Sequence, residues 1–135
     1  MIEVVNRQRR VKIDTDAWAG FATNALEAIG NNGSSSATIA FVSDKSIRKL
    51  NQQFRNVDKA TDVLSFPAGE LDNLGDVAVS VETAARQAKD NRLSFDNEIA
   101  QLILHGLLHL SGYDHETDNG EMNRLELKLR RKLKI

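Results

Sequence analysis

The sequence of 135 residues is 41% hydrophobic and 27% charged, with a single proline. This composition is typical of one globular domain and excludes long disordered segments, so we expect a single domain over residues 1–135. The chain has no cysteine, which excludes disulfide scaffolds and cysteine-ligated zinc fingers. Its net charge of −1 does not by itself indicate a polyanionic partner.

The first half of the chain alternates between strand and helix patterns. In chain order we predict a strand at 2–5, a helix at 16–29 with helical period, a strand at 37–43, a helix at about 44–54 and a strand at 62–67. The segment GNNGSSS ends the first helix, Ser43 or Asp44 caps the second, and Pro67 closes the last strand.

The second half contains one more strand and three helices. We predict a strand at 75–82 with period two, a surface helix at 82–91, a helix at 95–111 capped by Ser94 and a last helix at 117–133. The helix at 95–111 is apolar on nearly every side, which predicts that it is buried in the centre of the domain. The fold class is therefore α+β, with one mixed sheet of about four strands packed with four to five helices.

Basic residues gather near both ends of the chain. Arg7, Arg9, Arg10 and Lys12 lie near the start, and six Lys or Arg residues lie between 124 and 134. The C-terminal group suits either a helix end, where cations favour the macrodipole, or a basic rim for RNA. The first residues lack the apolar core of a signal peptide, and no apolar run approaches the roughly 18 residues of a membrane span. We therefore expect a cytoplasmic protein without a membrane partner.

All three histidines lie within the segment HGLLHLSGYDH, at residues 105–115. His105 and His109 are four residues apart on the predicted buried helix, so both project from one face. Gly112 can take a positive φ and turn the chain back, which brings His115 within reach of a shared ion. Three protein ligands leave a fourth position open, as in catalytic zinc sites. Nickel, copper and iron also bind imidazoles, but zinc is the expected metal, with one ion per chain.

This spacing matches the metzincin protease motif H-E-x-x-H-x-x-G-x-x-H at all three ligands and at the glycine. Gly106, however, stands where the metzincin motif has its catalytic Glu. A metal site without that general base is poorly equipped for peptide hydrolysis. The sequence therefore predicts a metzincin-like zinc helix and disfavours a protease.

The chain resembles the YbeY-type endoribonuclease family, on the histidine motif together with LNQQFRNVDKATDVLSFP (50–67) and GDVAVS (75–80). The resemblance implies a zinc-dependent, single-strand-specific endoribonuclease that acts in maturation of the small-subunit rRNA 3′ end and in ribosome quality control. It implies zinc ligation by His105, His109 and His115. The implied partners are single-stranded RNA, rRNA, the small ribosomal subunit and its assembly factors, and no DNA partner is expected.

The resemblance also places Arg55 in the cleft, where a guanidinium could hold a phosphate. By the residues alone, the favoured interpretation of Arg55 is a helix C-terminal arginine that suits the dipole, and only the resemblance favours the cleft. Asp114 could orient a ligand imidazole or shape the turn, and the role of Tyr113 stays open. Asp62 and Asp76 are expected to be turn and capping residues.

Two other classes of function remain as alternatives. One is a ribosome-assembly factor that binds RNA or protein and has a structural metal, which a fourth protein ligand would favour. The other is a metal-dependent hydrolase of a different substrate, which a deep, apolar and neutral pocket beside the metal would favour. An open three-ligand site in a cleft with basic walls would favour the endoribonuclease.

Overall fold

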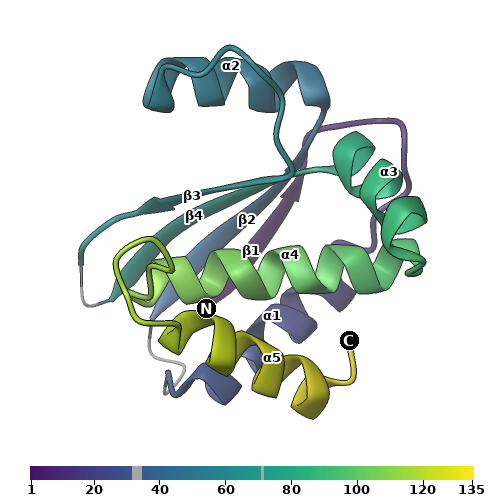
Figure 1. Ribbon diagram of the computed structural model, residues 1–135. Coiled ribbons are helices and arrows are strands. Elements are labelled where there is room, and N and C mark those ends of the chain that lie inside the picture. Colours follow the sequence, from purple (N-terminus) through teal and green to yellow (C-terminus); the bar gives the residue numbers. More distant parts are fainter. Residues whose placement is uncertain (32–34, 71) are drawn as a thin grey trace.

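The computed structural model describes residues 1–31, 35–70 and 72–135 (Figure 1). Within these ranges the order of elements is β1 (Ile2–Asn6), α1 (Thr15–Ile29), β2 (Ser36–Val42), α2 (Asp44–Arg55), β3 (Val63–Pro67), β4 (Asn73–Ser80), α3 (Val81–Asn91), α4 (Phe95–Leu110) and α5 (Glu121–Leu133). No helix of the described residues is both long and apolar enough to cross a membrane.

The four described strands form one sheet in the order β1-β2-β4-β3. β1, β2 and β4 run parallel, and β3 pairs antiparallel with β4 at the edge. Helix α2 covers one face of the sheet, whereas α1, α4 and α5 lie on the other (Figure 1). The mixed four-stranded sheet with five described helices confirms the predicted α+β class.

The alternation of side chains along β4 divides the core between these two faces. Val77 and Val79 belong to the main core with the buried residues of α4. Ala78, between them, points to the opposite face and belongs to a smaller cluster with Ile47 of α2. This follows from the period of two of a strand, because successive side chains point to opposite faces.

Helix α4 is buried along most of its length, as its sequence predicts. Ten of its sixteen residues are buried, and from Glu98 onward only Gln101, His105 and His109 are not. These three residues are spaced by four, so they form one open stripe along the helix. Both α4 histidines are therefore on the one side of the helix that the core does not cover.

Gly106 lets α4 lie close to the sheet. A Cβ at this position would come within 2.7 Å of a methyl carbon of Val77 on β4 and 3.3 Å of Ser65 Oγ on β3. A side chain at 106 would therefore enter the helix–sheet interface and not the stripe that carries the histidines. The packing of α4 on β4 accounts for the glycine where the metzincin motif has glutamate.

Several element boundaries differ from the sequence prediction by one to four residues, and three of these differences follow from side chains that cap a helix or hold a turn. The last helix begins at Glu121, not at 117, because Asp118 accepts hydrogen bonds from the backbone of Gly120 (2.8 Å) and Met122 (2.9 Å) and holds the preceding residues in turns. β4 ends at Ser80 because this side chain caps α3. The first helix begins one residue early, capped by Asp14 and closed by Gly30, whereas residues 32–34 of the predicted GNNGSSS stop lie outside the described residues.

Candidate metal centre

The three histidines come together at the C-terminal end of α4. One nitrogen from each of His105, His109 and His115 lies within 4.8 Å of the others. The Nε2 atoms of His105 and His109 are 3.2 Å apart. Gly112 has a φ of +99°, and this left-handed turn brings His115 back beside the helix. The fold therefore brings together the three residues that the motif predicted.

The outer nitrogens of the two helical histidines are both hydrogen bonded. His109 Nδ1 lies 3.0 Å from the carbonyl oxygen of Tyr113, which can only accept, so this nitrogen carries the proton. His105 Nδ1 lies 2.9 Å from a carboxylate oxygen of Glu126 on α5 and donates to it. In the neutral form of each ring, the Nε2 lone pair is then free and faces the other histidine.

This arrangement fits a single cation held by imidazoles. Two nitrogens each bound to a tetrahedral zinc at about 2.0–2.1 Å are about 3.3–3.4 Å apart. The 3.2 Å between His105 Nε2 and His109 Nε2 is close to that separation, and neither nitrogen has a proton to share with the other. A cation between the two lone pairs would relieve their mutual repulsion. The donor set of three neutral imidazoles suits zinc.

Glu126 is the residue of the site that the sequence did not predict. Its carboxylate is buried, with only 7% of the residue exposed, and it also accepts a hydrogen bond from Arg130 at 2.7 Å. Burial alone would raise the pKa of Glu126, but the hydrogen bonds and charges of His105 and Arg130 outweigh it and lower that pKa. The group stays ionised, which holds the His105 ring in one orientation.

His109 is held in its neutral, ligating form. Burial lowers the pKa of His109, and the neighbouring His105 lowers it further, against the opposing effect of the Tyr113 carbonyl. A neutral imidazole is the form that binds a metal.

The histidines lie in a cavity of about 990 Å³, which we call the histidine cleft. Arg55, at the last position of α2, lines the same cleft, although it is fifty positions before His105 in the chain. β3 provides one wall of the cleft through residues 63–67. The structure thus brings all four predicted site residues to one cavity, and Arg55 is at the same time a helix C-terminal cation.

The walls of the histidine cleft are not basic. Among the described residues that line it, Arg55 is the only lysine or arginine, and four are acidic: Asp62, Glu70, Asp114 and Glu116. Neither terminal basic group lines the cleft. Arg10 pairs instead with Glu82 at 3.5 Å, and the C-terminal cations include the last turn of α5, where the dipole favours them. Besides the three histidines, the described residues that line the cleft thus carry four carboxylates and one guanidinium.

The structure separates the roles of the aspartates and the tyrosine. Asp114 shapes the turn, since its carboxylate accepts from the backbone of Glu116 at 3.0 Å. Tyr113 acts through its carbonyl oxygen on His109, as described above. Asp62 is a turn residue as predicted, accepting from the backbone N–H of Val63 at 2.7 Å. Asp76 is not, because it lies inside β4 and is paired on both sides.

Comparison with known proteins matches nearly the whole chain to one family. The family described as Endoribonuclease YbeY matches residues 3–134. A relative from Koribacter versatilis, named Endoribonuclease YbeY, is 42% identical over 132 residues, covering 98% of this chain and 86% of its own. A relative of the same name from Aquifex aeolicus is 41% identical, covering 87% of this chain and 81% of its own.

A solved structure has a similar fold. The solution structure of TM1509 from Thermotoga maritima superimposes with a TM-score of 0.69 at 30% identity, covering 98% of this chain and 89% of that one. The family match spans both the helix with the histidines and the strand–helix unit that carries Arg55. The chain therefore belongs to the Endoribonuclease YbeY family.

Proposed function

We propose that this protein is a zinc-dependent endoribonuclease, specific for single-stranded RNA, that acts in the cytoplasm in maturation of the small-subunit rRNA 3′ end and in ribosome quality control. Membership of the YbeY family supports this proposal, as do the names of its relatives. Its partners would be rRNA, the small ribosomal subunit and the factors that assemble it.

One observation carries the proposal: three convergent imidazole nitrogens and a guanidinium line the same cleft. His105, His109 and His115 would hold the zinc. Bound there, zinc would polarise a phosphoryl oxygen and lower the pKa of a coordinated water. Arg55 would hold the scissile phosphate through two parallel hydrogen bonds and stabilise the charge that develops on it.

The chain's own side chains leave few groups free for proton transfer. All three histidines of the sequence are assigned to the metal, and two of them already use Nδ1 in hydrogen bonds. Gly106 offers no carboxylate, and its place in the sheet interface leaves no room for one. We therefore expect attack by water and not by the neighbouring 2′-hydroxyl, since the latter route usually employs a general acid and base pair.

Two features bear on the alternatives. The described residues supply three histidine ligands to this centre and no fourth His, Cys, Asp or Glu within the same group, which favours an open site over a closed structural one. The cleft is lined by five charged side chains besides the histidines, so it is not the deep, apolar and neutral pocket that would favour a metal-dependent hydrolase of a different substrate. The acidic residues leave phosphate binding to Arg55 and the metal.

The test compares zinc-loaded wild-type protein with His109→Ala on one RNA sequence, offered as a single strand and as a duplex. We expect the wild type to cut the single strand internally, the duplex to survive and the variant to cut neither. Both proteins are purified in parallel, so a contaminating nuclease would give equal cleavage in the two preparations. Equal cleavage, or none by the zinc-loaded wild type, would contradict the proposal.

A further inference from the structure

An aromatic side chain stands exposed at the rim of the histidine cleft. Phe54 is 59% exposed, although it is a large apolar residue. It lies in the last turn of α2, immediately before Arg55, and both residues line the cleft. A phenylalanine in water loses the stabilisation that burial of its ring would give, so its position has no explanation in the packing of the core.

The ring of Phe54 is nevertheless held in place. It contacts Phe66 of β3 edge to face, with ring centroids 5.1 Å apart and an interplanar angle of 65°. Phe66 is itself half-buried and packs against the smaller core cluster beneath α2. An exposed ring with a fixed neighbour loses less conformational freedom when a ligand binds than a free side chain would.

The location of Phe54 distinguishes it from the other exposed apolar residues. Among the described residues, the large exposed hydrophobics are Met1, Phe54, Val57 and Leu127, and of these only Phe54 lines the histidine cleft. It is also the only aromatic of the four. An apolar patch for a protein partner would be expected to extend over several such residues, whereas a single ring beside a guanidinium offers one flat surface and one phosphate site.

We propose that Phe54 is a stacking platform for one nucleobase of the RNA, adjacent to the phosphate that Arg55 holds. This inference rests on the proposed function. Unpaired bases are commonly bound by stacking on aromatic side chains, and such stacking tolerates any base because every base has a flat π face. A duplex keeps its bases stacked on one another and cannot offer one to Phe54, so the platform would contribute to preference for single strands.

The test measures binding of a fluorescent single-stranded RNA in the presence of a chelator, so that no cleavage occurs, and cleavage separately with zinc. The variants are Phe54→Ala, Phe54→Leu and Phe54→Trp, and the matched control is Val57→Ala, an exposed apolar residue of the same region that does not line the cleft. Thermal unfolding of each variant checks the fold. We expect Phe54→Ala and Phe54→Leu to weaken binding about tenfold, Phe54→Trp to keep it and Val57→Ala to leave it unchanged.

A second arm uses RNAs with a single abasic site at successive positions. One position should weaken binding to the wild type about tenfold and have no further effect on Phe54→Ala, because the variant has already lost that contact. If the wild type cuts RNA but Phe54→Ala or Phe54→Leu binds RNA with wild-type affinity, the stacking proposal is overturned and the proposed function is not. Absence of both binding and cleavage in the wild type would overturn the proposed function as well.

Discussion

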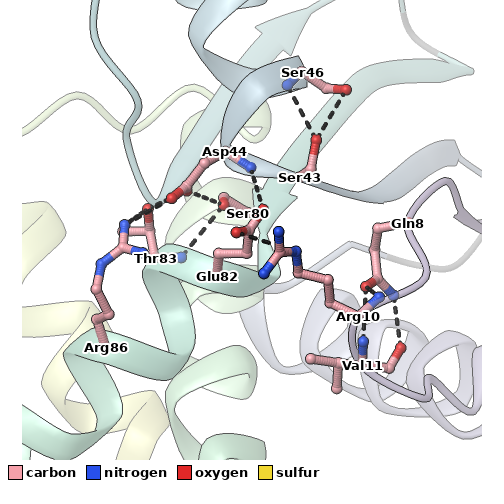
Figure 2. A network of polar contacts seen from close by, with 10 residues as sticks. All are labelled: Gln8, Arg10, Val11, Ser43, Asp44, Ser46, Ser80, Glu82, Thr83 and Arg86. Atoms are coloured by element: carbon pink, nitrogen blue, oxygen red, sulfur yellow. Dashed lines mark hydrogen bonds and ion pairs between the residues drawn. The ribbon is translucent and has the colours of Figure 1, made fainter.

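The protein has two polar clusters of different kinds, each built around a carboxylate. In the first, which we call the Asp44 cluster, Asp44 accepts hydrogen bonds from Ser80 (2.6 Å), Thr83 (2.6 Å) and Arg86 (2.8 Å), as Figure 2 shows. In the second, Glu126 holds His105, whose other nitrogen faces His109. The polar groups of the Asp44 cluster bond to one another, whereas the histidine nitrogens of the second cluster point toward a shared position.

The Asp44 cluster joins the start of α2 to the start of α3 and the end of β4. The backbone N–H of Asp44 donates to Glu82 at 3.0 Å, and Glu82 pairs with Arg10 at 3.5 Å (Figure 2). Each charge in it meets an opposite charge or a donor, so the network needs no ligand. Polar groups satisfied in this way hold elements together. The histidine cluster, in contrast, has its free lone pairs directed at one another, which is the arrangement of a binding site.

The largest expected effect is on the zinc content of the protein, which should depend on the histidine cluster and not on the Asp44 cluster. We predict that wild-type protein holds about one zinc per chain and that His109→Ala, His105→Ala or His115→Ala removes it, because two imidazoles bind far more weakly than three. Asp44→Asn should keep the full amount. Elemental analysis of the purified proteins measures this. Undiminished zinc in all three histidine variants would show that the metal lies elsewhere.

The next effect concerns the cation of the cleft. Arg55→Ala should retain zinc and fold but lose cleavage about 100-fold or more, by loss of charge stabilisation on the phosphate. Arg55→Lys should recover little, because an ammonium is a point charge and cannot make the two parallel hydrogen bonds. Single-turnover cleavage rates measure both. A lysine variant that cuts at the wild-type rate would refute the bidentate contact, and loss of zinc in either variant would indicate a structural role.

A smaller effect should arise from the carboxylate behind the metal. Glu126→Gln removes the charge that orients His105, and we expect zinc affinity to fall about 10- to 100-fold while cleavage returns at high zinc concentration. Glu116→Gln is the matched control, because Glu116 lines the cleft but its carboxylate forms no hydrogen bond with a histidine among the described residues. Competition with a chelator measures affinity. Equal losses in both variants would mean that general electrostatic attraction, not orientation, is responsible.

Asp44→Asn should lower the stability of the fold and leave the metal centre intact. Loss of the hydrogen bonds to a charged acceptor should cost about 1–2 kcal/mol in the free energy of unfolding. Burial alone would raise the pKa of Asp44, but Ser80, Thr83 and Arg86 lower it below its ordinary value of 3.8. This contribution is therefore present above pH 3.8 and is lost as the pH falls through the pKa of the folded state.

The measurement is urea unfolding of wild type and Asp44→Asn between pH 7 and pH 3. The difference in unfolding free energy should be constant near neutral pH and should shrink below about pH 3.8. Asp58→Asn provides the control, because Asp58 forms an exposed pair with Arg48 and its loss should have a much smaller effect. A pH-independent difference for Asp44→Asn would mean that its charge does not stabilise the fold.

The smallest expected effect is that of removing the 2′-hydroxyl next to the scissile phosphate, which tests which group attacks that phosphate. A substrate with one 2′-deoxy sugar at the scissile position should still be cut at that bond, because water and not the 2′-hydroxyl is expected to attack. Preference for RNA would then come from contacts along the strand. Mapping of the product ends measures this. Loss of the cut together with cyclic phosphate ends on the normal product would show that the internal hydroxyl attacks.

Much of this protein could be predicted from its sequence, because the relevant patterns are local. Periodicity placed the strands and helices of the described chain to within a few residues, and the apolar character of residues 95–111 predicted the buried helix. The spacing of His105, His109 and His115 with Gly112 is set by helix geometry and one turn, so a single short segment determines how these side chains meet.

Only the tertiary structure could show the parts that depend on distant segments. Glu126 meets His105 across 21 positions because α5 packs on α4, and Phe54 and Arg55 reach the histidine cleft because α2 lies above β3. The insertion of β4 between β2 and β3 sets that arrangement. Strand order and helix packing depend on the burial of apolar faces over the whole chain. The sequence around Glu126 or Phe54 therefore does not predict which distant residue each of them contacts.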